Sequence, residues 1–138
     1  DVCNHTLWHA NLGKYDDAVV QEQIARGLLA IDSVLPGYEV RTFALPLGVW
    51  PKNRELAYRG SWTDPRSGRT VRYEHDAVLL VAGGPARSPY DPEFDPLKLP
   101  RFIVFDHELE KLLDRLDRER GRYVSDGEPE TIARPPSP

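Results

Sequence analysis

The 138-residue chain carries 18 Lys and Arg against 22 Asp and Glu, a formal net charge of −4. This slightly acidic balance gives no reason to expect DNA, RNA or an anionic membrane as a partner. The length suits one compact domain rather than two, and no apolar run approaches the roughly 20 residues that cross a bilayer. The single cysteine, Cys3, excludes an intramolecular disulfide.

The first clear element is a helix from Asp16 to about Val34. Asp16 can cap its first turn, and apolar residues recur at spacings of three and four, at Val20, Ile24, Leu28 and Ile31. Pro36-Gly37 then forces a turn.

Residues 39–72 are predicted to hold one strand, one short helix and one hairpin. Residues 39–44 alternate as a strand does, and the Pro and Gly of Leu45-Pro46-Leu47-Gly48 end the pairing in a loop. A short helix is expected over 52–59. The turn residues Asp64-Pro65 and Ser67-Gly68 indicate a hairpin or an excursion loop over 61–72.

The later part of the chain begins with a continuous apolar run over 77–82, which is typical of a strand buried on both faces. The proline-rich residues 85–100 are interpreted as an ordered surface loop, and 101–105 as another short strand. A second helix is expected over 106–120, capped by Asp106, with Leu109, Leu112, Leu113 and Leu116 on its inner face. Gly121 suits the position after this helix, and the end of the chain is expected to fray.

Strands that alternate with helices indicate an α/β domain with a largely parallel sheet. About three strands and two long helices are too few for a closed barrel, so the fold class we predict is part of a distorted (β/α) barrel that lacks its N-terminal strands. Because the sequence opens at Asp1 without a Met, we expect the chain to begin inside a longer protein.

The most informative segment is Asn4-His5-Thr6-Leu7-Trp8-His9. Two imidazoles four residues apart lie on one face of a helical turn, and both can reach one metal ion at about 2.1 Å. The Thr6 hydroxyl between them can orient one ring. The same spacing also arises by chance, and two histidines leave a catalytic zinc site one protein ligand short.

The context of this pair resembles a known family. Asn-His-Thr-x-x-His, followed by a long amphipathic helix, is similar to the second signature of the polysaccharide deacetylases (carbohydrate esterase family four). The run Thr42-Phe43-Ala44-Leu45-Pro46-Leu47-Gly48 resembles the third signature, at a fitting separation. Residues 101–104 and 123–127 resemble the endings of one bacterial branch.

The resemblance implies metal-dependent hydrolysis of N-acetyl groups on a chitin-like polymer or on peptidoglycan, with a divalent metal, zinc foremost, as cofactor. It makes His5 and His9 the metal ligands and the Leu47 backbone N–H the oxyanion donor, which a Tyr-to-Leu change leaves in place. Pro46 and Gly48 would shape the substrate groove. The family further implies a secreted or cell-envelope protein of the bacterial cell wall.

Aromatic residues in loops offer a second kind of substrate contact. Trp50, Trp62 and Tyr90 can stack on sugar rings or pack against the core, and Trp50 is favoured for stacking because it follows the third signature. His75 and His107 are interpreted as ordinary surface or strand-end histidines.

The departures from the family limit what the chain can do alone. The first signature, Thr-Phe-Asp-Asp, which supplies the catalytic base and the third metal ligand, should precede the histidines and is not found. Ala44 replaces the arginine that braces the base, and the late Leu-x-His that supplies the general acid has no counterpart.

We therefore predict that residues 1–127 form the C-terminal portion of a deacetylase-like domain, with a Pro-rich tail over 128–138. The active site is expected to be incomplete and inactive in isolation, and the N-terminal segment could be present as a separate chain. Two different hypotheses stay open, namely a non-catalytic carbohydrate-binding protein that keeps the fold and a metal site that serves only structure.

Overall fold

The computed structural model describes residues 2–105 and 108–118. The chain divides into two compact units, the first made of Asp1–Pro85 and Asp95–Phe102, the second of Ala86–Phe94 and Ile103–Pro138. The two units are described separately below, and the predicted site residues from His5 to Trp50 all lie in the first.

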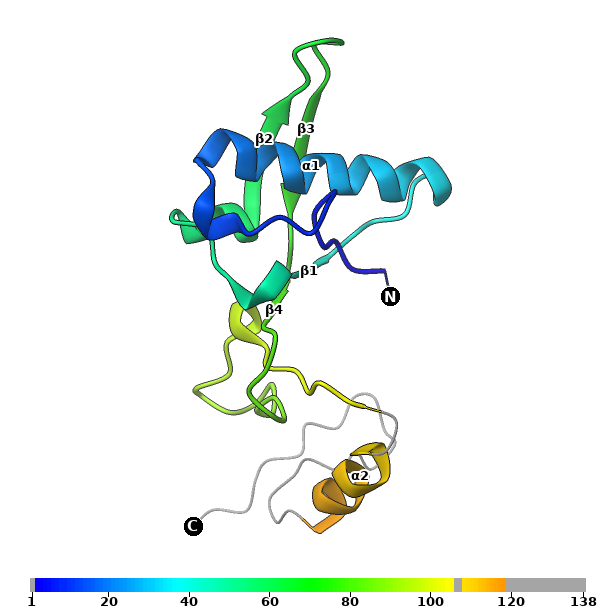
Figure 1. Cartoon of the computed structure of the whole chain (residues 1–138), viewed down its shortest axis with the longest axis vertical. Helices are drawn as coiled ribbons and strands as arrows, with labels where there is room; N and C mark the ends of the chain where they lie inside the picture. Colours follow the sequence, from blue (N-terminus) through cyan, green and yellow to red (C-terminus); the bar gives the residue numbers. More distant parts are fainter. Residues whose placement is uncertain (1, 106–107, 119–138) are drawn as a thin grey trace. The chain divides into compact units, whose positions relative to one another are not determined.

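Helix α1 (Asp17–Val34) confirms the strongest helical pattern of the sequence (Figure 1). The Asp16 carboxylate accepts a hydrogen bond from the Val19 N–H at 3.0 Å, which satisfies one of the free donors of the first turn. Val20 and Ile24 are fully buried on the inner face of the helix. Beyond the helix, Gly37 adopts a φ of 77°, so the predicted turn is also present.

A small parallel sheet forms the base of the first unit. Strand β1 (Thr42–Ala44) pairs in parallel with β4 (Ala77–Leu79). Isolated parallel bridges extend this pairing on both sides, from Asn4 to Phe43 and from Leu79 to Leu99. The four extended segments therefore lie side by side in chain order, and α1 connects the first to the second. A mixed α/β architecture is thus confirmed, whereas the described residues show no closed barrel and the barrel remains a prediction.

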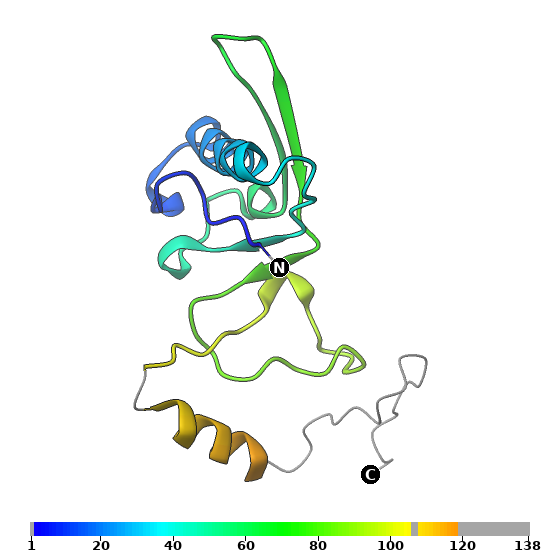
Figure 2. The same ribbon diagram turned by 90° about the vertical axis from the view of Figure 1, so that its right-hand side faces the viewer.

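The second sheet is the hairpin of β2 (Arg59–Thr63) and β3 (Thr70–Glu74), with Trp62 opposite Val71. It confirms the hairpin expected from the turn residues at 64–68, and its tip projects past α1 (Figure 2). Alternate residues face the core: Tyr73 is buried, and its hydroxyl donates to the Leu56 carbonyl at 2.9 Å. The pair is antiparallel, unlike the parallel sheet that the sequence led us to expect.

Several predicted elements are shorter than expected. The strand expected over 39–44 begins only at Thr42, and the helix expected over 52–59 is a 3-10 turn, Arg54–Ala57. The apolar run over 77–82 leaves the sheet after Leu79, so Val81 is 41% exposed rather than buried.

The strand predicted over 101–105 is wrong. Leu99 takes its place beside β4: its N–H donates to the Val78 carbonyl, and its carbonyl accepts from the Leu80 N–H. Pro100 follows and has no N–H to continue the ladder. Ile103 and Phe105 are consequently each 59% exposed.

The core of the first unit brings together side chains from every part of it. They come from the turn before α1, from α1 itself, from both sheets and from the 3-10 turn: Ala10, Leu12, Val20, Ile24, Ala25, Phe43, Leu45, Leu56, Ala57, Tyr73 and Val78. This core packs α1 against β2, β3 and the 3-10 turn (Figure 1).

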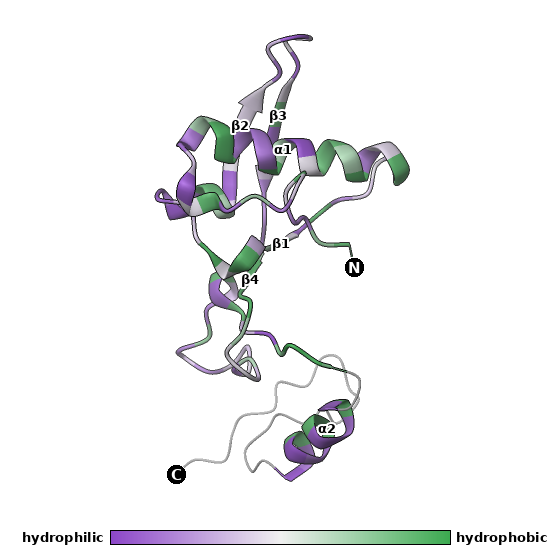
Figure 3. Ribbon diagram, in the orientation of Figure 1, coloured by the Kyte–Doolittle hydropathy of each residue, from purple (hydrophilic) through white to green (hydrophobic). Residues whose placement is uncertain are grey.

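In the second unit, helix α2 (Leu109–Arg118) forms where the second helix was predicted. Its apolar and polar sides are distinct (Figure 3). None of its described residues is buried, however: Leu112 and Leu116 of the predicted inner face are partly exposed, and Leu109 and Leu113 are exposed. Asp106, Gly121 and the predicted boundary between residues 127 and 128 lie outside the described residues.

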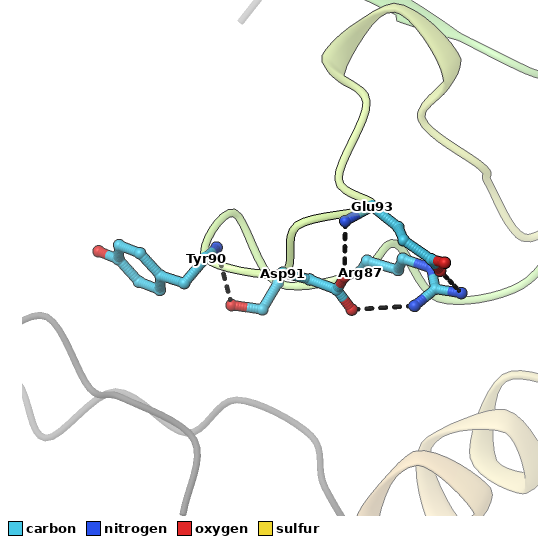
Figure 4. Close-up of polar contacts among 5 residues, drawn as sticks. Arg87, Tyr90, Asp91 and Glu93 are labelled. Atoms are coloured by element: carbon cyan, nitrogen blue, oxygen red, sulfur yellow. Dashed lines mark hydrogen bonds and ion pairs between the residues drawn. The ribbon is translucent and has the colours of Figure 1, made fainter. Parts of the chain in front are cut away.

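Residues 86–94 of the second unit form a loop, as predicted, whereas two later parts of the predicted loop do not: Pro96–Lys98 form a 3-10 turn and Leu99 pairs with β4. The Arg87 guanidinium pairs with the carboxylates of Asp91 and Glu93, and Asp91 also accepts from the Glu93 N–H at 2.8 Å (Figure 4). These groups are largely solvent-exposed, so the ion pairs add little to stability. Neither helix of the described chain has the length and apolar character that crossing a bilayer requires.

Candidate functional site

The histidine segment leaves the parallel sheet at the carboxyl end of its strands. Asn4 is held in the sheet by two backbone hydrogen bonds, its N–H to the Thr42 carbonyl and its carbonyl from the Ala44 N–H, both 2.9 Å. His5 follows immediately, and the 45–48 loop leaves β1 at the same edge. In parallel α/β sheets this edge is where ligands bind.

The two histidines meet, but not through a helical turn as predicted. Thr6 and His9 have φ values of 65° and 61°, in the left-handed region, so the segment is an irregular turn. Its chain path still places the two rings together, with centroids 4.8 Å apart and an interplanar angle of 64°.

The ring of His5 has a defined orientation. Its Nδ1 lies 2.8 Å from the Ala44 carbonyl oxygen. Because a carbonyl can only accept, Nδ1 must carry the proton and Nε2 is left with a lone pair, the arrangement usual for a metal-binding histidine. The backbone of Ala44 thus contributes to the site although its side chain does not.

The geometry of the pair fits two ligands of one zinc-like ion. Imidazole nitrogens bound at about 2.1 Å on a tetrahedral ion place the ring centroids about 5 Å apart, close to the observed spacing. Within residues 2–105 and 108–118, no cluster of three or more His, Cys, Asp or Glu suited to a metal is present. The described residues therefore hold no complete metal site, and the roles of His5 and His9 as metal ligands stay predictions.

Thr6 has hydrogen-bond partners other than the rings. Its hydroxyl oxygen accepts from the Ala10 N–H at 3.2 Å, and its own N–H donates to the Asn4 side-chain oxygen at 3.0 Å. Thr6 shapes the turn in this way. Its predicted role in orienting a ring stays a prediction.

The loop after β1 is bent by two left-handed residues, Leu47 at φ 57° and Gly48 at φ 67°. Pro46 is buried beneath it, while Leu47 is 53% exposed. The Leu47 N–H has no acceptor among the described residues, as an oxyanion donor requires in the absence of substrate. The roles predicted for Pro46, Leu47 and Gly48 remain predictions that this geometry allows.

The aromatic candidates differ in their surroundings. Trp50 is half-buried against the core, and the Arg54 guanidinium lies 5.3 Å from its ring centroid. Trp62 also packs against the core. These contacts favour core packing for both tryptophans, and sugar stacking by Trp50 stays a prediction. Tyr90 belongs to the second unit.

His75 corrects one expectation. It lies at a strand end, between β3 and β4, but it is buried rather than on the surface. Its ring stacks between Phe43 and Tyr73, at 5.3 and 5.6 Å, and its Nδ1 is 3.0 Å from the Ala57 carbonyl. Burial lowers the pKa of His75, so the ring is a neutral core side chain. His107 lies outside the described residues.

Three residues near the pair were missed by sequence reasoning. Asn4 is completely buried, Gly27 of α1 lies against it, and Trp8 is 54% exposed between the two histidines. One feature of the sequence could have indicated the buried side chain of Asn4, namely an asparagine directly before the first histidine. The role of Gly27 depends on a contact between distant segments, which periodicity does not reveal.

Comparison with known proteins points to one family. Residues 1–60 match the family model described as polysaccharide deacetylase. The matched range contains the histidine segment, α1, β1, the 45–48 loop and Trp50, and it ends before the hairpin is complete. No curated protein and no solved structure matched the chain. The resemblances at 101–104 and 123–127 lie beyond the match and stay predictions.

Proposed function

We propose that this chain, whose residues 1–60 match the polysaccharide deacetylase family model, contributes part of an active site that hydrolyses N-acetyl groups on N-acetylglucosamine polymers. The proposed substrates are a chitin-like polymer or peptidoglycan. A secreted or cell-envelope location is part of the same proposal, because such polymers lie there.

One observation supports the proposal above all, namely the His5–His9 pair with ring centroids 4.8 Å apart. The Ala44 carbonyl holds the proton of His5 on Nδ1, so Nε2 is available to a divalent ion, for which we propose zinc. Such an ion, when bound, supplies carbonyl polarisation and a more acidic water. His5 and His9 would hold it.

The Leu47 N–H is proposed to donate to the oxygen that becomes negative when the acetyl carbonyl is attacked. Its backbone conformation, φ 57° and ψ 9°, is fixed between buried Pro46 and Gly48. A donor that needs no reorganisation during the reaction is the kind that lowers such a barrier most.

The catalytic base and a third ligand must come from outside the described part of the chain, since no acidic side chain in it joins the two histidines. We propose that a carboxylate-bearing segment, on the same polypeptide or on a separate chain, completes the site. The isolated 138-residue chain is then inactive or nearly so.

Zinc binding by the purified chain tests the metal part of the proposal. We expect His5→Ala and His9→Ala each to weaken zinc affinity by more than about 100-fold in isothermal titration, since even outer-shell losses cost about 10–100-fold. His107→Ala serves as the control for the loss of one imidazole. Equal affinities in all four proteins would refute the assignment of this pair.

Acetate release tests the reaction. The chain is mixed with a segment that carries paired aspartates, and release of acetate from an N-acetylglucosamine oligomer is measured with and without chelator. Release that the chelator abolishes supports the proposal. Oligomer binding without zinc binding or turnover would instead support a non-catalytic carbohydrate-binding protein.

A further inference from the structure

We infer that Asn4 is a positioning residue for the histidine pair and that residue 27 of α1 must be glycine to leave room for it. The inference rests on the proposed function in taking His5 and His9 as ligands. It adds a residue whose effect is transmitted through the turn, without contact with the metal or the substrate.

Asn4 connects three parts of the fold at one buried point. Its side-chain N–H donates to the Ile24 carbonyl of α1 at 3.1 Å, and its side-chain oxygen accepts from the Thr6 N–H at 3.0 Å. Its backbone groups pair with β1 on either side of Phe43. The side chain is completely buried, so no water can replace these partners without rearrangement.

Gly27 is explained by the same contact. A Cβ at this position would lie 2.5 Å from the Asn4 side-chain oxygen and 3.1 Å from the Thr6 carbonyl carbon. Glycine is a poor residue within a helix, and Gly27 is not in a left-handed conformation that would call for it. Close approach of α1 to the Asn4–Thr6 turn is therefore the reason for this glycine.

The turn needs such support because its backbone is unfavourable. Left-handed conformations at Thr6 and His9 persist only where surrounding contacts impose them. Asn4 anchors the residue before His5 in the sheet, and its side chain binds the N–H of the residue after it. The backbone on both sides of His5 is thus fixed, which sets the direction of its ring toward the Ala44 carbonyl.

A purely structural role for Asn4 would affect stability alone, so the test compares stability with zinc affinity and ring tautomer. Asn4→Asp keeps the acceptor for Thr6 and replaces the donor to Ile24 by an oxygen. Gly27→Ala adds one methyl group and improves helix propensity. Val20→Ala, a fully buried position on the same helix, is the matched control.

Zinc affinity is measured by chelator competition at temperatures where circular dichroism shows each variant folded, and the His5 tautomer by imidazole nitrogen NMR of metal-free protein. We expect Asn4→Asp and Gly27→Ala each to weaken affinity by at least about 10-fold and to change His5 from one Nδ1–H tautomer to a mixture. Val20→Ala should lower the melting temperature and change neither.

The inference fails if folded Asn4→Asp or Gly27→Ala keeps the zinc affinity and the His5 tautomer of the wild type. It also fails if Val20→Ala loses as much zinc affinity as these two variants. Should Asn4→Asp not fold, Gly27→Ala decides alone, because its substitution favours the helix. A third outcome separates the two ideas. If the wild-type chain shows a single His5 tautomer that the variants lose, but binds no zinc, the proposed function is refuted. The positioning role of Asn4 then still stands.

Discussion

At the scale of single residues, His75 shows how burial affects a titratable side chain. Its Nδ1 is paired with the Ala57 carbonyl, while its buried Nε2 has no partner among the described residues. Burial is the largest influence on its pKa, which lies below the ordinary 6.5. Between the folded pKa and about pH 6.5 the unfolded chain therefore binds more protons than the folded one.

The contribution of neutral, buried His75 to the free energy of unfolding is therefore fully present above about pH 6.5. It declines as the pH falls toward the folded pKa of His75. We expect a contribution of up to about 1.4 kcal/mol per pH unit to the slope of the free energy of unfolding. His75→Phe, which can stack between Phe43 and Tyr73, should flatten this slope in urea titrations at pH 7.5 and 5.5. An unchanged slope would assign the pH dependence to other groups.

The histidine pair shows what can be inferred from sequence at this scale. The residue types and spacing of His5 and His9 predicted that the two rings lie close together, and their centroids are 4.8 Å apart. The backbone of this segment was predicted wrongly, because Thr6 and His9 adopt left-handed conformations and the Thr6 N–H is bound by the buried Asn4 side chain instead of by a helical partner. The spacing by itself suggested a helical turn, because residues i and i+4 lie on one face of a helix.

At the scale of elements, the loop after β1 depends on the absence of a side chain at Gly48. A Cβ there would lie 2.5 Å from the Val81 Cγ1, and the φ of Gly48 is 67°. Gly48→Ala should therefore lower the free energy of unfolding by about 2–4 kcal/mol through backbone strain and the displaced valine.

Gly37→Ala is the matched control for that prediction. Gly37 has a φ of 77°, but a Cβ there would meet nothing within 4 Å. Gly37→Ala should therefore lower the free energy of unfolding by about 1 kcal/mol, through backbone strain alone. Chemical denaturation of both variants isolates the contact with Val81, and equal losses would show that the contact costs nothing.

The cap of α1 gives a second prediction at this scale. Asp16→Ala should lower the free energy of unfolding by about 1 kcal/mol, since the Val19 N–H loses its acceptor. Asp17→Ala removes the same charge one position later without removing the capping bond. Thermal unfolding should separate the two variants, and a larger loss for Asp17→Ala would contradict the capping role.

Elements fixed by local signals were predicted well, and those fixed by distant partners were not. The periodicity and cap of α1 and the turn residues of the β2–β3 hairpin lie within short stretches of sequence. The ends of β4 depend instead on Leu99, twenty residues further along the chain, which pairs where 101–105 was expected. No local pattern distinguishes these two candidates for the same partner.

At the scale of the whole molecule, the hydrophobic core that the described residues form lies in the first unit. All members of the core cluster lie between Ala10 and Val78, and the partly buried residues around it extend only to Leu97. α2 buries none of its residues among those described. The free energy of folding should therefore come almost entirely from residues before position 105.

A chain that ends at residue 105 tests this distribution. It keeps both sheets, α1 and the Leu99 pairing, so its free energy of unfolding in urea should lie within about 1 kcal/mol of the 138-residue value. Zinc affinity should also be unchanged, because both histidines and their supports are retained. A large loss of stability in the shortened chain would show that the later residues cover α1 or the sheets, and the leucines of α2 would then be the first side chains to substitute.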